Sequence, residues 1–170
     1  MPYLNVQDDP VITSGYPGSS GVTAAERRAL RRALDPEDVE RAAVLLCAEA
    51  GGLRIDGEIF RRHAPAGCRS VFILALTGED VPPEGGNYRL FKVRLIGRDE
   101  NAAVLHRKFA LVHAGLPGDV FTSVVSRRIS GTVHFARCTV EKAAFDVRSE
   151  QGCSVTTGVM EISLLVCIAP

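Results

Sequence analysis

The sequence has no excess of charge of either sign. Twenty basic residues balance 20 acidic residues in a chain of 170, so the formal net charge is zero. A balanced chain has no general electrostatic attraction to nucleic acid or to an anionic membrane surface. The sequence also shows no secretory signal and no apolar run of the roughly 20 residues that cross a bilayer. We therefore expect one folded domain with no membrane partner.

Metal-binding cysteine pairs are missing as well. The five cysteines are Cys47, Cys68, Cys138, Cys153 and Cys167. None of them forms a Cys-x-x-Cys pair, so a zinc site has little support. Cys47 and Cys167 lie in apolar runs typical of small buried thiols. We expect no metal and no cofactor, and a reducing compartment, with one disulfide as an open alternative.

Motifs that would indicate catalysis are scarce. The chain has no phosphate-binding glycine-rich loop and no Gly-x-Ser-x-Gly turn around a nucleophilic serine. His106 and His113 are seven residues apart on a predicted helix, about 10 Å, which is too far to chelate one metal ion without further ligands. The only conceivable nucleophile pair is His134 with Cys138 or Cys153. We expect a protein that is not an enzyme.

The stretch from residue 87 to residue 116 organises the rest of the chain. Residues 87–96 alternate apolar and polar side chains, which predicts a half-buried strand. Gly97 is expected to break this strand, and Asp99 is expected to cap the helix that follows. Apolar residues then recur at helical spacing, at Ala102, Leu105, Phe109, Val112 and Leu116. A strand therefore leads directly into a helix that can lie back on the sheet.

Two helices are predicted before this stretch. Thr23 and Glu26 fit a capping box at the start of a short helix rich in arginine. Asp35 and Pro36 open a second helix, with acidic residues in its first turn, and Gly51-Gly52 ends it. Residues 1–22 are rich in proline, glycine and serine, and we expect them to form an extended arm.

The remaining strands are predicted from apolar density and alternation. Residues 70–77 form a continuous apolar strand, expected to be an antiparallel neighbour of 87–96 through a loop at 78–86. Residues 132–147 read as a strand interrupted by a bulge. Residues 148–154 are polar and predict a hairpin loop, and 157–168 form the last strand.

This order of elements predicts the fold class. We expect an α+β two-layer sandwich, with a mostly antiparallel sheet of about four strands and helices packed on one face. The arm would occupy residues 1–22 and a single α+β domain residues 23–170.

The same layout resembles the tail terminator proteins of long-tailed bacteriophages, also called tail completion or minor capsid proteins. The resemblance is carried by the run Val71-Phe-Ile-Leu-Ala-Leu-Thr-Gly78, the strand 88–96, the turn Gly97-Arg98-Asp99, an alanine-rich helix and two closing strands. It covers roughly residues 36–168 and is one of topology and hydrophobic pattern. The arm and the first short helix depart from the family's compact pattern.

The resemblance implies a structural role in a virion. Proteins of this family form a ring, commonly a hexamer, that caps the tail tube and joins it to the head-side connector. The implied partners are identical subunits, the tail tube protein and head-tail connector proteins, with DNA only as cargo through the lumen. The implied location is the tail or neck of a virion assembled in the host cytoplasm.

Candidate interface residues are taken from the arm, the arginine-rich segments and the exposed loops. They are Tyr3, Leu4, Val11, Ile12, Tyr16, Arg27, Arg31, Glu79, Asp80, Arg127, Arg128, Arg148 and Glu150. Mixed charges of both signs suit head-to-tail contacts around a ring.

Two alternatives stay open. One is another neck component, such as a head-tail connector subunit. The other is a small α+β enzyme or ligand-binding domain that uses His134, Cys138 and arginines in a pocket.

Overall fold

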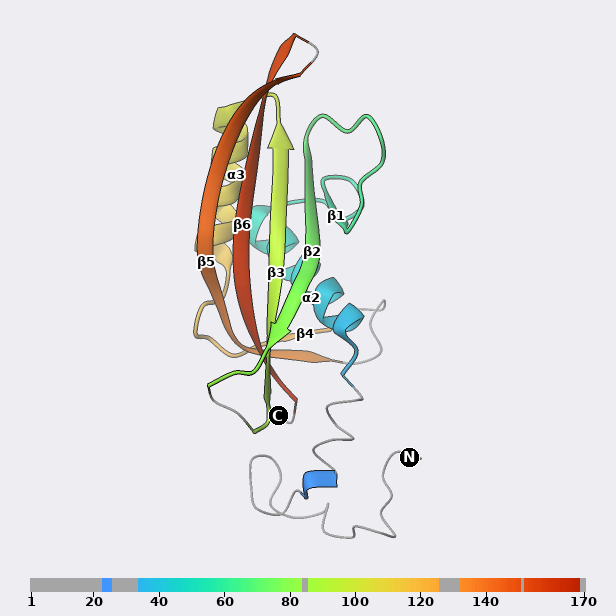
Figure 1. Ribbon diagram of the computed structural model, residues 1–170, viewed down its shortest axis with the longest axis vertical. Coiled ribbons are helices and arrows are strands. Elements are labelled where there is room, and N and C mark those ends of the chain that lie inside the picture. Colours follow the sequence, from blue (N-terminus) through green and yellow to red (C-terminus); the bar gives the residue numbers. More distant parts are fainter. Residues whose placement is uncertain (1–22, 26–33, 84–85, 126–131, 151, 169–170) are drawn as a thin grey trace.

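The computed structural model describes residues 23–25, 34–83, 86–125, 132–150 and 152–168. The predicted arm at 1–22 and the arginines at 27–32 lie outside these residues. From residue 34 on, the described residues form two helices and six strands in the order α2 (Pro36–Gly51), β1 (Ile59–Arg61), β2 (Val71–Asp80), β3 (Tyr88–Asp99), α3 (Ala102–Gly115), β4 (Thr122–Val124), β5 (Val133–Glu150) and β6 (Cys153–Cys167). Figure 1 shows the long strands running side by side along the molecule.

The sheet differs from the predicted one. Six strands lie in the order β1-β2-β3-β6-β5-β4, and β1 pairs with β2 in parallel while all other pairs are antiparallel. The sheet is curled like half of a barrel, so the expected two-layer sandwich of about four antiparallel strands is wrong. β1 and β4 have only three residues each, too few for alternation to predict a strand.

Helix α2 begins and ends as the sequence predicts. The side chain of Asp35 accepts the backbone N–H of Glu37 at 2.9 Å, and Pro36 occupies the first turn. Gly52 follows the helix in the left-handed conformation with φ 62°, which costs glycine little. The helix is therefore fixed at both ends by local sequence.

The N-cap of helix α3 lies two residues after the predicted N-cap, Asp99. Asn101 is the N-cap, and its side chain accepts the N–H of Val104 at 3.2 Å. Asp99 is instead the last residue of β3, where its carboxylate accepts the Asn101 N–H and the Ser70 hydroxyl, each at 2.7 Å. The carboxylate thus joins the end of β3 to the start of β2 and does not cap the helix.

Gly97 does not break β3, contrary to the prediction. It lies within the strand, where an added Cβ would be 2.5 Å from the Phe109 ring of α3 and 2.6 Å from the Phe72 ring of β2. The glycine therefore permits α3 to approach the sheet closely, and no turn is needed.

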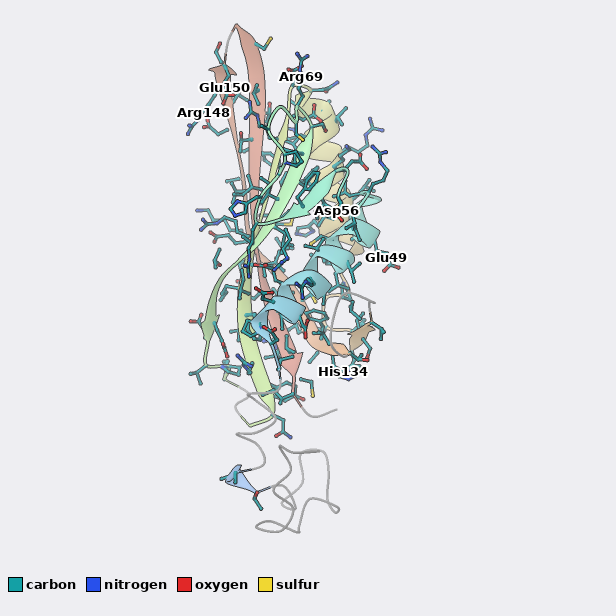
Figure 2. All side chains as sticks on the ribbon, turned by 90° about the vertical axis from the view of Figure 1, so that its right-hand side faces the viewer. Glu49, Asp56, Arg69, His134, Arg148 and Glu150 are labelled. Carbon is teal, nitrogen blue, oxygen red and sulfur yellow. The ribbon has the colours of Figure 1, made fainter. Side chains whose placement is uncertain are left out.

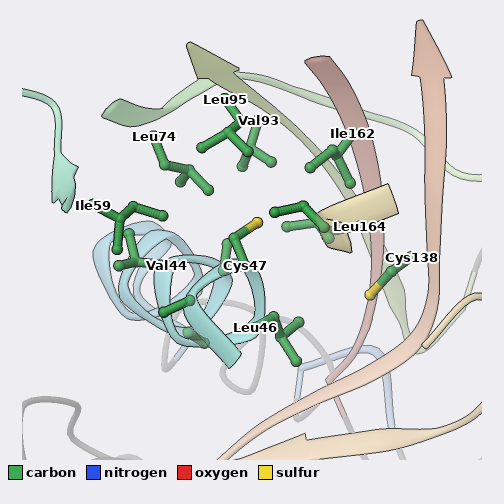
Figure 3. Close-up of a cluster of buried hydrophobic side chains, with 14 of the residues drawn as sticks. Val44, Leu46, Cys47, Ile59, Leu74, Val93, Leu95, Cys138, Ile162 and Leu164 are labelled. Carbon is green, nitrogen blue, oxygen red and sulfur yellow. The ribbon is translucent and has the colours of Figure 1, made fainter. Parts of the chain in front are cut away.

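Both helices pack on the same face of the sheet (Figures 1 and 2). Cys47 of α2 points toward the apolar side chains of β2, β3 and β6 in Figure 3. The central strands contribute the fully buried residues Phe72, Leu74, Phe91, Val93, Leu95, Met160, Ile162 and Leu164. This cluster is the hydrophobic core, and its burial is the main favourable contribution to folding.

The last two strands form one long hairpin. β5 continues to Glu150 through irregularities at Phe135/Arg137 and Val140/Lys142, which confirms the predicted bulged strand. The predicted loop at 148–154 is shorter than expected, because pairing continues to Glu150 opposite Cys153. Figure 1 shows the hairpin end at the top of the molecule, at the opposite end of the sheet from the last residues of β6.

Candidate functional site

The outer half of β5 is exposed along its whole length. Every residue from 141 to 150 is exposed, including the apolar side chains Phe145 and Val147. These residues pair with β6 on one side, from Lys142 opposite Glu161 to Glu150 opposite Cys153. This stretch is therefore hydrogen-bonded to β6 along one edge, and its other edge is open to a partner.

The second side of β5 has few neighbours among the described residues. β4 pairs only with Val133–Phe135, and the Cys138 N–H donates to the Gly118 carbonyl at 2.8 Å. Beyond Cys138 no described strand lies against this side. Alternate residues of an edge strand turn their N–H and C=O groups outward, so β5 offers a row of hydrogen-bonding groups there.

Phe145 packs the outer half of the β5–β6 hairpin against α3. Its ring lies 5.3 Å from the Phe109 ring at 86° and 4.3 Å from the His106 ring. Across the ladder Phe145 faces Gly158, where an added Cβ would be 2.6 Å from Phe109 and 2.8 Å from Phe145. The missing side chain at Gly158 therefore makes room for both rings.

Ion pairs cross the other face of the hairpin and its neighbours. Arg98 of β3 pairs with Glu150 of β5, and Arg94 of β3 pairs with Glu161 of β6 at 3.0 Å. Arg148 pairs with Asp146 two residues earlier at 2.7 Å, and this hydrogen bond raises the pKa of Arg148. The charges of this face largely compensate one another.

The opposite end of the sheet has a second open edge. β1 covers β2 only from Phe72 to Leu74, and no described strand covers the same side of β2 from Leu76 to Asp80. At the start of this stretch, the Leu76 N–H donates to Glu40 at 2.7 Å. A carboxylate from α2 thus takes the place that a further strand would fill.

Glu40 was not predicted as a special residue. It is 1% exposed and accepts hydrogen bonds from Arg61 at 3.0 Å and from Arg62 at 2.7 Å. On the sequence it reads only as a charged helix residue, because its partners lie more than 20 positions away.

Nine of the thirteen predicted interface residues lie outside the described part of the chain. These are Tyr3, Leu4, Val11, Ile12, Tyr16, Arg27, Arg31, Arg127 and Arg128. Arg148 and Glu150 lie on the hairpin near its end (Figure 2). Glu79 and Asp80 lie at the end of β2, at the opposite end of the molecule (Figure 1). The structure therefore does not bring these four residues together.

Glu79 has a role within the fold. It receives two hydrogen bonds from Arg89, at 2.6 Å and 2.8 Å. Arg89 also donates to the Leu34 carbonyl at 3.1 Å and lies 4.9 Å over the Phe91 ring. This arrangement ties the chain before α2 to the end of the β2–β3 hairpin.

The predicted nucleophile pair is not assembled. His134 Nδ1 lies 2.8 Å from the Ser123 hydroxyl, and its ring stacks on Phe121. Cys138 is buried, and burial raises its pKa to about 12, so its thiolate is scarce at neutral pH. Cys153 lies at the far end of the hairpin from His134.

The described residues contain no group of three or more His, Cys, Asp or Glu side chains placed to hold a metal ion. No helix among them is long and apolar enough to cross a membrane. Two hollows lie along α2, one of about 770 Å³ beside Val44, Leu45 and Phe60, and one of about 500 Å³ beside Leu53 and β4.

Comparison with known proteins gives a likeness only to solved structures. No family profile and no curated protein matches the sequence. A chain in the solved virion of a native gene transfer agent particle is similar at 18% identity and a TM-score of 0.42, over 87% of this chain and 99% of that chain.

Proposed function

We propose that this chain is a structural virion protein that closes with identical subunits into a ring. The observation that carries the proposal is a pair of open sheet edges on different strands. Within the described residues, β5 beyond Cys138 and β2 beyond Leu76 each lack a strand on one side. An open edge is a ready surface for pairing with another chain.

Because the two edges differ, contact between them is head-to-tail. A head-to-tail contact leaves one edge of each subunit free for the next subunit. The chain of subunits closes into a ring when a whole number of the rotations between neighbours makes one full turn. A symmetric pair through β5 alone would stop at a dimer. Open edges on two different strands, β2 and β5, therefore favour a ring.

The charges on the outer half of β5 support selective pairing. Three acidic and two basic side chains alternate there: Glu141, Lys142, Asp146, Arg148 and Glu150. Charged side chains on an edge oppose unspecific aggregation, while mixed signs fix the register with a matching partner.

The place of the ring follows from the sequence resemblance to tail terminators. We propose that the ring, a hexamer, ends the tail tube and joins it to the head-side connector, with DNA passing through the lumen. The chain then acts without a catalytic residue, in a particle assembled in the host cytoplasm. Electron microscopy of particles labelled with an antibody against this chain tests the place: label is expected at the head-proximal end of the tail.

The neck alternative makes a different prediction in the same images. A connector subunit would stay with the head, so the label would lie at the neck vertex of tailless heads and free tails would carry no label. The small-enzyme alternative loses the support of its proposed pair, since Cys138 is buried and His134 is engaged with Ser123 and Phe121.

Edge pairing is tested with a substitution on β5. Val147 is 63% exposed, so Val147→Lys is expected to leave the fold intact while placing a charge beside the pairing edge. Leu111→Lys is the matched control, an exposed apolar residue on α3 outside the sheet. The first variant should lower the assembly mass and the second should not. Equal assembly by both variants would exclude the β5 edge as the contact.

A further inference from the structure

The two hollows along α2 join into one surface, here named the α2 groove. The hollow of about 770 Å³ and the hollow of about 500 Å³ share Leu45 and Ile55 in their walls. Phe60 of β1 lines the larger hollow, and Val124 and Val125 line the smaller one. The groove therefore runs from β1 past α2 to β4.

The α2 groove has an apolar lining that is open to solvent. Ile55 is 40% exposed and Val125 is 72% exposed, while Val44 and Leu46 beneath them are buried. Contiguous exposed apolar surface of this kind marks an interaction site.

The groove also offers backbone groups. β4 is the last strand of the sheet and pairs with β5 on one side, and no other described strand lies on its second side. An extended segment lying in the groove can therefore pair with β4 while its side chains fill the hollows.

We propose that the α2 groove takes residues 3–16 of a second copy of this chain. This segment holds the apolar residues Tyr3, Leu4, Val6, Val11, Ile12 and Tyr16. Its only charged side chains are Asp8 and Asp9, and it contains no lysine or arginine. Arg41 and Arg61 line the larger hollow and already pair with acidic residues of α2, while Asp56 and Glu49 are the acidic residues in the lining of the groove. The apolar content of the segment therefore matches the apolar side chains that line the groove.

The course of the chain favours a second copy over the same copy. Thr23–Ala25 lie beyond the end of the sheet at which α2 begins, whereas the groove lies along the second half of α2, toward Gly52 (Figure 1). Thr23 itself thus lies on the side away from the groove of its own chain. A span of 14 extended residues covers roughly 45 Å, enough to reach an adjacent subunit.

The proposal rests on self-association, as the proposed function does, and it is tested by cross-linking two different full-length chains. Both carry Cys68→Ser and Cys153→Ser. These substitutions remove the two cysteine thiols that are not buried. One chain also carries Val11→Cys, and the other carries Ile55→Cys. After mixing, a short bis-maleimide joins the two thiols as thioethers, and denaturing electrophoresis separates the joined pair.

The expected result is a joined heterodimer for Val11→Cys with Ile55→Cys. Val81→Cys replaces Ile55→Cys as the matched control, since Val81 is 90% exposed and lies outside the groove. A synthetic peptide of residues 3–16 in excess should lower the heterodimer yield. Val125→Asp in the Ile55→Cys chain should lower it about tenfold, because the segment would then bury an unpaired carboxylate.

Two results would overturn the inference: a heterodimer yield equal to that of the Val81→Cys control, or a yield that the peptide does not change. The result of the cross-linking experiment can be told apart from the result that tests the ring. A ring mass in solution without the cross-link would leave the ring standing and remove the segment from the groove. A cross-link in a protein that forms only dimers would support the segment in the groove and contradict the ring.

Discussion

The Glu40 carboxylate of α2 accepts the backbone N–H of Leu76 on β2 at 2.7 Å. Its other oxygen receives Arg61 and Arg62, so one buried side chain joins the helix to the end of β1 and to the uncovered part of β2. A buried carboxylate is tolerated when hydrogen bonds and opposite charges surround it. The same contact satisfies one donor of the β2 edge from within the chain.

Removing this carboxylate should destabilise the protein. We expect Glu40→Ala to lower the free energy of unfolding by about 2–3 kcal/mol, below the full cost of breaking a buried pair because both arginines are partly exposed. Urea denaturation followed by circular dichroism measures the loss. Glu37→Ala is the control, since Glu37 pairs with the same arginines from a half-exposed position. Equal losses from both substitutions would contradict the role given to Glu40.

Gly97 should tolerate no side chain. Gly97→Ala brings a methyl group into the Phe109 and Phe72 rings, and we expect a loss of about 1–3 kcal/mol from overpacking. Gly78→Ala, in β2, meets no atom within 4 Å and should change stability by less than about 0.5 kcal/mol. Thermal unfolding of the two variants compares them directly, and similar melting temperatures would show that α3 does not lie tightly on the sheet.

Phe145 should hold the outer half of the hairpin against α3. Phe145→Ala removes both ring contacts, so backbone amides of 141–155 should exchange hydrogen faster while those of the buried strands keep their protection. Val147→Ala, at an exposed neighbouring position, should leave exchange unchanged. Hydrogen exchange followed by mass spectrometry resolves the two regions. Unaltered exchange in Phe145→Ala would mean that β6 alone orders the hairpin.

Stability should fall in alkaline solution through Cys47. Burial raises its pKa from the ordinary value of 9.0 to about 12. Between these values the unfolded thiol ionises while the folded thiol keeps its proton, so the stability present below pH 9 is lost as pH rises toward 12. The expected slope is up to about 1.4 kcal/mol per pH unit from this group. Cys47→Ala should flatten the pH dependence relative to the natural chain, and an unchanged slope would contradict the assignment.

Local sequence signals predicted the helices and the long strands. Asp35, Pro36 and Gly52 act within one or two residues of each other, so the ends of α2 can be read directly from the sequence. The antiparallel pairing of β2 with β3 was also predicted, and the register confirms it. Such features depend on neighbours along the chain.

Features that depend on distant contacts were missed or misread. The sequence predicts a turn at Gly97 because a glycine permits both a turn and a close approach, and only Phe109, from the following helix, decides between them. β1 and β4 are strands because β2 and β5 lie beside them, and their three residues carry no pattern of their own. The open edges could not be predicted, because they follow from the strand order.

The central claim is that the chain closes into a ring, and its mass in solution tests this most directly. Multi-angle light scattering of the purified full-length protein over a wide concentration range measures that mass. Our account predicts one discrete assembly of several subunits, a hexamer, or growth toward it with concentration. A single species at 18.3 kDa, the mass of one chain, at every concentration would contradict it.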